Sequence, residues 1–189
     1  AHTLAGEILL VEDAQITAVS SRVKERAQAF ADEFGIPRAH GSYLELLADD
    51  DVDVVYVATP HAQHAEIVEA ALDARKPVLC EKAFTTSLAD TERLAQKARD
   101  LGVFCMEAMW TRFAPLIGRL RRVVADGGIG EVRSISADLG FVAGPQAKDR
   151  IWDPALGGGA LLDVGIYPIA FAQMLLGSPQ TLAAHGTLT

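Results

Sequence analysis

Short apolar runs alternate with longer amphipathic stretches along the first part of the chain. The apolar runs are rich in Val, Ile and Leu, which is typical of strands covered by helices on both faces. This alternation predicts parallel strands joined by helical crossovers, a doubly wound α/β sheet. We expect the strands at residues 15–21, 52–59, 77–81 and 103–107.

The helices between these strands have ends that the sequence marks. Ser42 and Glu45 form a capping-box pattern, and Ser87 precedes a long amphipathic stretch. Gly35 and Gly102 follow helical runs, where glycine readily takes the left-handed conformation that ends a helix. The predicted helices therefore begin and end where the strand pattern needs them to.

The pattern changes near Met109. Residues 113–126 predict an arginine-rich helix, and residues 130–141 alternate as in an antiparallel strand before a glycine run. We therefore predict a boundary that separates residues 1–109, an α/β domain, from residues 110–189, the start of an α+β domain with a mainly antiparallel sheet. Residues 182–189 are strand-like without a closing element, so we expect this second domain to be incomplete.

Composition narrows the possible partners. The chain has 17 basic and 25 acidic residues and a net charge of −8, which disfavours nucleic acid and anionic membranes and favours a small neutral or polar ligand. Cys80 and Cys105 lie in apolar runs, so we expect buried thiols instead of a disulfide or metal ligands. No run approaches about 18 apolar residues, and the first residues lack a secretory signal. The cytoplasm is the default location.

Three groups of residues carry a family resemblance. Thr59 and Pro60 with His64 follow one strand, Glu81 and Lys82 end the next, and DVGIY at 163–167 follows a glycine run. With CMEAMWTRFAP and GGGALLDVGIYP, these groups resemble the glucose-fructose oxidoreductase, inositol dehydrogenase and MocA family, in its trans-1,2-dihydrodiol dehydrogenase-like branch. The resemblance extends across essentially the whole chain. It implies a Rossmann-type dinucleotide domain over 1–109 and a domain for substrate and subunit contacts over 110–189.

The sequence departs from the family at two points. The family's first strand ends in a glycine-rich turn that holds the pyrophosphate, and this turn would precede Ala1. We therefore expect the chain to begin at the helix after the turn, without the first strand, and the isolated chain to be inactive. Ala83 replaces the proline that usually follows Lys82.

The resemblance implies three catalytic residues. Lys82, after a strand, would hydrogen-bond the reacting oxygen and stabilise its negative charge. Tyr167 would be the general acid or base; a free tyrosine has a pKa of about 10, and an ammonium such as Lys82 would favour its phenolate. Asp163, one helical turn before Tyr167, would orient the substrate or its neighbours. Pro168 is expected to kink or interrupt this helix.

The expected substrates are cyclic trans-diols or sugars, and aromatic side chains suit them. We expect Trp110 and Phe141 to bind the substrate together with Asp163 and Tyr167. Core packing is an equally good interpretation of Trp152. The three glycines at 157–159 permit either close backbone approach to a ligand or a sharp turn.

NADP is the predicted cofactor, with NAD the weaker alternative. Ser21 and Arg22 end the second strand of the fold where NAD-specific proteins usually carry an acidic residue, and Arg26 lies one helical turn further on. Both arginines suit a 2′-phosphate, and two exposed arginines at a helix start are the alternative interpretation. The resemblance adds further cofactor-binding residues: Thr59, Pro60, His64, Glu81, Lys82, Trp110 and Arg112.

Other hypotheses stay open. His61 and His64 are three apart, but no third ligand is evident and the family uses no metal, so we expect none. A sugar or inositol dehydrogenase is the nearest alternative function. A nucleotide-binding regulatory protein without turnover is the rival from another class, and Lys82, Asp163 and Tyr167 together argue against it. The family also implies a homodimer or homotetramer.

Overall fold

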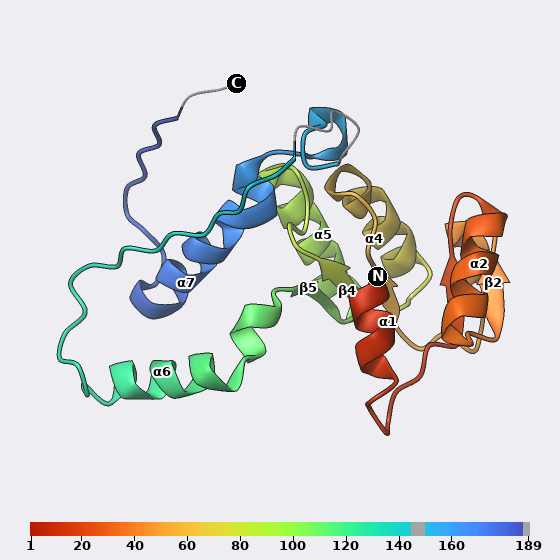
Figure 1. Ribbon diagram of the computed structural model, residues 1–189, viewed down its shortest axis with the longest axis horizontal. Helices are drawn as coiled ribbons and strands as arrows, with labels where there is room; N and C mark the ends of the chain where they lie inside the picture. The colour runs from red at the N-terminus through yellow and green to blue at the C-terminus, as the bar shows by residue number, and fades with distance from the viewer. Residues whose placement is uncertain (145–149, 187–189) are drawn as a thin grey trace. The chain divides into compact units, whose positions relative to one another are not determined.

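The computed structural model describes residues 1–144 and 150–186. The chain folds as two units, Ala1–Ala108 and Met109–Thr189. Figure 1 shows the chain coloured from its first residue to its last.

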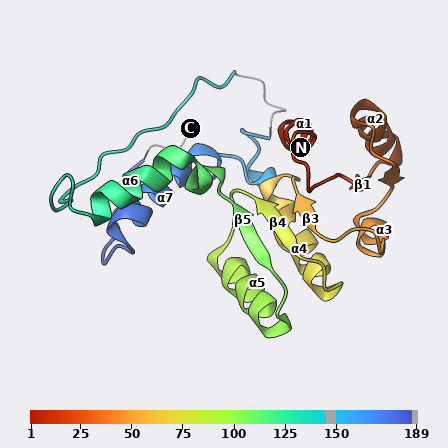
Figure 2. The same cartoon turned by 90° about the horizontal axis from the view of Figure 1, so that it is seen from below.

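The first unit is built on short parallel strands. They are β1 (Ala18–Ser20), β2 (Arg38–His40), β3 (Val55–Val57), β4 (Val78–Glu81) and β5 (Cys105–Ala108). β1 pairs with β2, and the other strands form a second sheet in the order β3-β4-β5 (Figure 2). All of these pairs are parallel, which confirms the predicted α/β class. Each predicted strand overlaps one observed strand, and β5 runs one residue past its predicted end. β2 was missed, because its residues Arg-Ala-His form no apolar run.

The helices of this unit are α1 (His2–Ile8), α2 (Lys24–Phe34), α3 (Tyr43–Leu47), α4 (His64–Asp73) and α5 (Leu88–Leu101). Ser42 and Ser87 cap α3 and α5 by accepting hydrogen bonds from the third backbone N–H groups beyond them, at 3.2 and 3.1 Å. Gly35 and Gly102 end α2 and α5 with φ angles of 67° and 64°. The helix ends predicted from the sequence are therefore confirmed.

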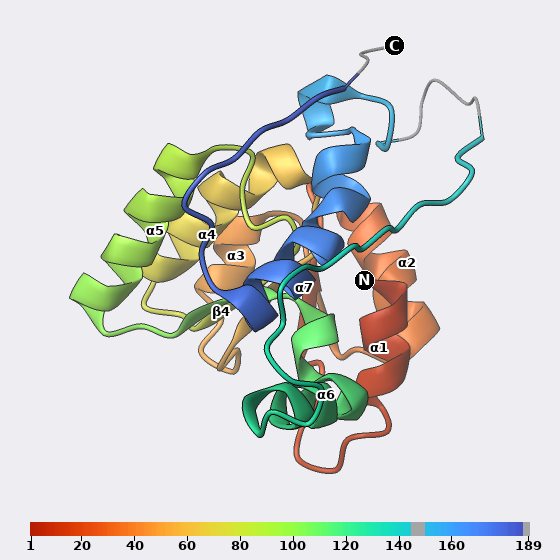
Figure 3. The same cartoon turned by 90° about the vertical axis from the view of Figure 1, so that its left-hand side faces the viewer.

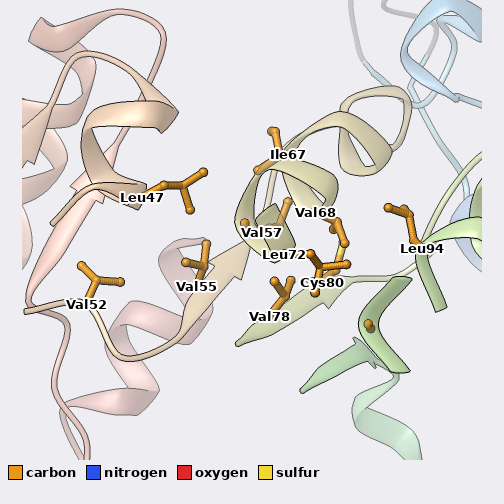
Figure 4. Close-up of a cluster of buried hydrophobic side chains, with 12 residues drawn as sticks. Leu47, Val52, Val55, Val57, Ile67, Val68, Leu72, Val78, Cys80 and Leu94 are labelled. Carbon is orange, nitrogen blue, oxygen red and sulfur yellow. The ribbon is translucent and has the colours of Figure 1, made fainter. Parts of the chain in front are cut away.

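The core of the first unit lies between the β3-β4-β5 sheet and the helices α4 and α5. Val68 and Leu72 of α4 and Leu94 of α5 are fully buried against Val78 and Cys80 of β4 (Figure 4). α3, α4 and α5 follow one another as neighbours (Figure 3). This packing explains why the strands read as nearly continuous apolar runs.

Both cysteines are free thiols, Cys80 buried and Cys105 half-buried. Burial raises the pKa of each thiol above its ordinary value, which keeps the sulfur protonated at neutral pH. They pack as small apolar side chains.

The second unit contains α6 (Pro115–Ala125), a π-helical turn (Leu161–Gly165) and α7 (Ile166–Leu176), with 3₁₀ turns at Trp110–Phe113 and Pro154–Leu156. The predicted arginine-rich helix is α6. The strand predicted over 130–141 is not formed, because within the described part of this unit the segment finds no strand to pair with. Residues 182–186 are likewise outside any strand, and 187–189 lie beyond the described residues.

The second unit contains a long apolar helical stretch. Within the described residues, the helical stretch Pro154–Leu176 is long and apolar enough to cross a membrane by length and composition alone, a test that buried helices of other proteins also pass. Asp163, Pro168 and several glycines interrupt its apolar residues, so it is not an unbroken apolar run.

Replacing Leu72 by Ala should destabilise the first unit. The side chain is fully buried in the core, so the change removes apolar contacts and leaves a cavity, at a cost of about 2–5 kcal/mol in the free energy of unfolding. Denaturant unfolding followed by circular dichroism measures this. The matched variant Leu88→Ala, at a leucine that is 73% exposed, should change it by less than about 0.5 kcal/mol. Equal losses in the two variants would contradict the described core.

Candidate active site

His64 joins the two loops that follow β3 and β4. The imidazole is fully buried at the start of α4. Its Nδ1 lies 2.9 Å from the carbonyl oxygen of Ala83, and its Nε2 lies 2.8 Å from that of Thr59. A carbonyl only accepts, and a neutral imidazole supplies one N–H where an imidazolium supplies two. Both ring nitrogens therefore face backbone oxygens, which leaves neither for a metal ion.

The loop with Lys82 is also held from neighbouring strands. The Lys82 N–H donates to Oε2 of Glu81 at 3.2 Å, and the Phe84 N–H donates to Oε1 of Glu107, at the end of β5, at 2.9 Å. The peptide bond between Lys82 and Ala83 is cis. Lys82 itself is half-buried at the carboxyl end of β4. Its backbone is thus fixed on both sides.

Tyr56 on β3 is a site neighbour that the sequence did not indicate. Its hydroxyl donates to Oε1 of Glu81 on the adjacent strand. Burial, followed by the bond to Glu81, raises the pKa of Tyr56 above its ordinary value, so the phenol stays protonated and remains a donor. Glu81, predicted as a cofactor-binding residue, is therefore engaged by Tyr56 and by the Lys82 N–H.

The end of β1 presents the predicted phosphate-binding residues. Ser21 is half-buried, and its Oγ accepts the Val23 N–H at 3.3 Å. Arg22 precedes α2 and Arg26 lies in its first turn, and both are exposed. Two guanidinium groups at the carboxyl end of a parallel strand are a suitable donor set for a phosphate monoester. The residues present therefore fit NADP.

The described residues contain no group of three or more His, Cys, Asp and Glu side chains arranged to hold a metal ion. His61 is buried like His64, and the two rings meet edge to face at 5.7 Å between centroids. The two rings pack against each other where the 3₁₀ turn His61–Gln63 leads into α4.

Tyr167 and Trp110 meet in the second unit. The indole Nε1–H of Trp110 donates to the Tyr167 hydroxyl oxygen at 3.1 Å, and the rings meet edge to face with centroids 6.1 Å apart. Trp110 lies in the 3₁₀ turn and Tyr167 in the first turn of α7, 57 residues later. Two residues that the sequence assigned to the site are therefore in direct contact.

Asp163 is buried in the π-helical turn and is 6% exposed. Its Oδ1 accepts a hydrogen bond from Nη1 of Arg150 at 3.2 Å. Arg150 was not predicted as a site residue, because nothing in the spacing of the sequence links it to Asp163. The ion pair stabilises the carboxylate in a place where burial alone would disfavour it.

α7 runs through Pro168, so the predicted interruption of the helix there is not seen. Proline occupies the first turn of α7, where a backbone N–H is not needed for the helix, so α7 runs through it. The irregularity lies just before it, in the π-helical turn that contains Asp163.

A cavity of about 230 Å³ lies beside Tyr167. Arg112, Asp138 and Leu139 line it together with Phe171 of α7. Phe141 is exposed, and the Trp152 indole donates to the carbonyl of Gly144 at 2.8 Å. Arg112 and Tyr167 thus border one cavity, whereas Phe141 and Trp152 are not among the residues that line it.

The middle glycine of the run 157–159 has a packing reason. A Cβ on Gly158 would lie 2.6, 2.7 and 2.8 Å from the carbonyl oxygens of Arg150, Ile151 and Asp153. The Gly158 N–H also donates to the Asp153 carbonyl at 2.9 Å. Gly158 therefore lies close to the chain's own backbone. This packing holds the turn that carries Arg150.

These features define one class of protein, the parallel α/β proteins of the Rossmann type. Residues 4–109, more than half of the chain, match the family described as oxidoreductases with an NAD-binding Rossmann fold, and residues 117–189 match the GFO/IDH/MocA C-terminal domain. The chain belongs to the GFO/IDH/MocA oxidoreductase family, which confirms the resemblance found in the sequence.

Similar proteins include trans-1,2-dihydrobenzene-1,2-diol dehydrogenase from Mus musculus, 44% identical over 92% of this chain and 52% of the relative. D-xylose 1-dehydrogenase (NADP(+)) 2 from Haloferax volcanii is 42% identical, over 93% of this chain and 54% of the length of that dehydrogenase. A 3-ketoreductase from Actinomadura kijaniata, solved with NADP and TDP-benzene, has a TM-score of 0.83 and 38% identity over 92% of this chain and 53% of its own. The chain spans about half the length of the curated relatives it matches.

Replacing Gly158 by Ala should destabilise the second unit by about 1–3 kcal/mol, because the new methyl group would overlap three carbonyl oxygens. Thermal unfolding followed by tryptophan fluorescence measures the loss. Gly140→Ala is the matched control, since a Cβ there meets no atom within 4 Å. A Gly158→Ala variant as stable as the control would show that the described turn is wrong.

Proposed function

We propose that the protein is an NADP-dependent oxidoreductase that transfers hydride between nicotinamide and a secondary alcohol of a cyclic diol or sugar. The observation that carries this proposal is the placement of Lys82 at the carboxyl end of β4, in a loop fixed by His64, Glu81 and Glu107. Ligands of open parallel sheets bind at this edge. The names of the similar proteins support the same substrate class.

NADP is the proposed cofactor because of Arg22 and Arg26. Both side chains are exposed at the end of β1, and a 2′-phosphate there would receive charge-assisted hydrogen bonds. Thr59, Pro60, His64 and Glu81 would shape the loops beside the nicotinamide, with Trp110 and Arg112 contributing from the second unit. NADP in the Actinomadura kijaniata complex supports this choice.

Lys82 and Tyr167 have separate chemical roles in the proposal. In the direction of oxidation, the carbinol proton passes to Oη of Tyr167, and Lys82 stabilises the negative charge that develops on the substrate oxygen. NADP, when bound, would supply the acceptor for the hydride. The Trp110 N–H, which donates to Oη of Tyr167, stabilises negative charge on that oxygen. Asp163, paired with Arg150, positions the turn before Tyr167.

The proposal assigns dinucleotide binding to residues 1–109 and substrate and subunit contacts to residues 110–189. Phe141, with Trp110, Asp163 and Tyr167, would contact the substrate. A cytoplasmic homodimer or homotetramer is the proposed state of the whole protein. A sugar dehydrogenase is the second candidate, and the D-xylose and aldose-aldose oxidoreductase names among the similar proteins favour it.

Replacing Tyr167 by Phe should lower kcat about 10²–10⁴-fold, because the variant loses the group that exchanges the substrate proton. The dissociation constant of NADPH, measured by cofactor fluorescence, should stay within about twofold and below that of NADH. Steady-state assays with dihydrodiols and with aldoses separate the two candidate substrates.

Unchanged turnover in Tyr167→Phe would remove the proposed proton exchange. Tight NADPH binding without turnover of any diol or sugar by the whole protein, extended to the length of its relatives, would favour the non-catalytic regulatory alternative.

A further inference from the structure

Tyr56 and Glu81 are joined by a side-chain hydrogen bond that crosses from β3 to β4. In the parallel pairing of these strands Tyr56 is the register partner of Leu79, so Glu81 lies two residues further along β4. Side chains two residues apart in a strand point to the same face of the sheet. The Tyr56 phenol therefore reaches along the face opposite the one that buries Cys80 in the core, toward the carboxyl end of β4.

Both oxygens of the Glu81 carboxylate accept a hydrogen bond. Oε1 accepts the Tyr56 hydroxyl, and Oε2 accepts the backbone N–H of Lys82 at 3.2 Å. The last torsion angle of a glutamate is soft, so a carboxylate held through one oxygen can still turn. A carboxylate held through both oxygens cannot turn without breaking one bond. The Tyr56 hydroxyl therefore determines where Oε2 lies, and with it the position of the Lys82 N–H.

Tyr56 is a firmly placed donor. It is the middle residue of β3, and its neighbours Val55 and Val57 are buried in the core. The Val55 N–H donates to the carbonyl of Pro77 at 2.8 Å, which ties β3 to the start of β4. Side chains carried by strands hold a neighbouring site more precisely than side chains carried by loops. Because a displacement of about 1 Å can lower a rate about 10²-fold, a donor fixed in the sheet suits the support of a reacting group.

A direct part in proton exchange does not suit Tyr56. Burial, followed by the bond to Glu81, raises the pKa of its hydroxyl above the ordinary value of a tyrosine. The phenol therefore stays protonated at neutral pH, and its proton is already donated to a carboxylate. General acid–base catalysis favours a group whose pKa lies near the working pH. Tyr56 is thus suited to hold a neighbour, and proton exchange is left to Tyr167.

We propose that Tyr56 is a positioning residue for Lys82 and acts through the Glu81 carboxylate. The Tyr56 hydroxyl holds Glu81, and Glu81 holds the Lys82 N–H. The backbone of Lys82 then sets the point from which its side chain reaches the substrate oxygen. This inference rests on the proposed function, because it takes Lys82 as the residue that stabilises charge on that oxygen.

Amide hydrogen exchange in the 189-residue chain, followed by NMR, tests the geometric step without turnover. In Tyr56→Phe, which keeps the ring and removes only the hydroxyl, the Lys82 amide should exchange at least about tenfold faster. The Phe84 amide, which donates to Glu107 instead, should change less than about twofold. Tyr43→Phe is the matched control, because Tyr43 is also half-buried and its hydroxyl makes no hydrogen bond within the described residues. The control should leave both amides unchanged.

Steady-state kinetics of the whole protein, extended to the length of its relatives, test the consequence. Tyr56→Phe should lower kcat about 10- to 100-fold, because a displaced Lys82 stabilises the substrate oxygen less well. The dissociation constant of NADPH should stay within about twofold, and the pH limits of turnover should not move, because Tyr56 stays protonated at neutral pH. Glu81→Met has a side chain of similar length that accepts neither bond. In that background Tyr56→Phe should lower kcat by less than about twofold more, whereas a purely structural loss would add to it.

Three results would overturn the inference: Lys82 exchange no faster in Tyr56→Phe than in Tyr43→Phe, an equal acceleration at Phe84, or losses of kcat that add in the double variant. If Tyr56→Phe does not fold, Glu81→Met makes the same comparison of the Lys82 and Phe84 amides, because it removes the same link. Absence of turnover by the unaltered whole protein would contradict the proposed function. Slow exchange at Lys82 would contradict this inference alone, so the two failures are distinguishable.

Discussion

The geometry of the candidate site in the first unit depends on the contacts of the buried His64 imidazole. It lies between the carbonyl oxygens of Thr59 and Ala83, and so it ties the loop after β3 to the loop after β4. No solvent reaches this ring to replace either contact. Without it, at least one of the two carbonyl groups would lose its buried donor, and the backbone that carries Lys82 would be held from fewer sides.

The parallel sheet decides where this contact is useful. Parallel strands bring their carboxyl ends to one edge, so the residues that follow β1, β3 and β4 gather there although they are far apart in sequence. Glu81 and Glu107 lie at the ends of β4 and β5. The Glu81 carboxylate accepts hydrogen bonds from the Tyr56 hydroxyl and the Lys82 N–H, and the Glu107 carboxylate accepts one from the Phe84 N–H. Acidic side chains at this edge therefore organise backbone. The basic side chains of Arg22, Arg26 and Lys82 are the charges at this edge that the proposal assigns to ligands.

Local signals in the sequence predicted much of the fold. Caps, glycine stops and apolar runs act over a few residues, so the helices and most strands of the first unit were found. β2 was missed because Arg38–His40 is paired without being apolar. The strand expected over 130–141 was wrong because alternation cannot supply the neighbour that a strand needs.

The candidate site was predicted less completely, for a similar reason. Lys82, Asp163 and Tyr167 stood out through motifs, and the Trp110–Tyr167 contact joins two of the predicted residues. Tyr56 and Arg150 were not predicted from the sequence, because their roles arise from contacts across strands or turns that no spacing rule encodes. Tertiary contacts of this kind become visible only in the folded chain.

The amide of Phe84 gives the most direct test of the role of His64. It donates to Glu107 from the loop that His64 holds, so its hydrogen exchange reports how firmly that loop is fixed. In His64→Asn, which keeps a polar side chain but not the reach to both carbonyls, we predict exchange at Phe84 at least tenfold faster, with α2 amides unchanged. A folded variant in which Phe84 exchanges as slowly as before would contradict the account.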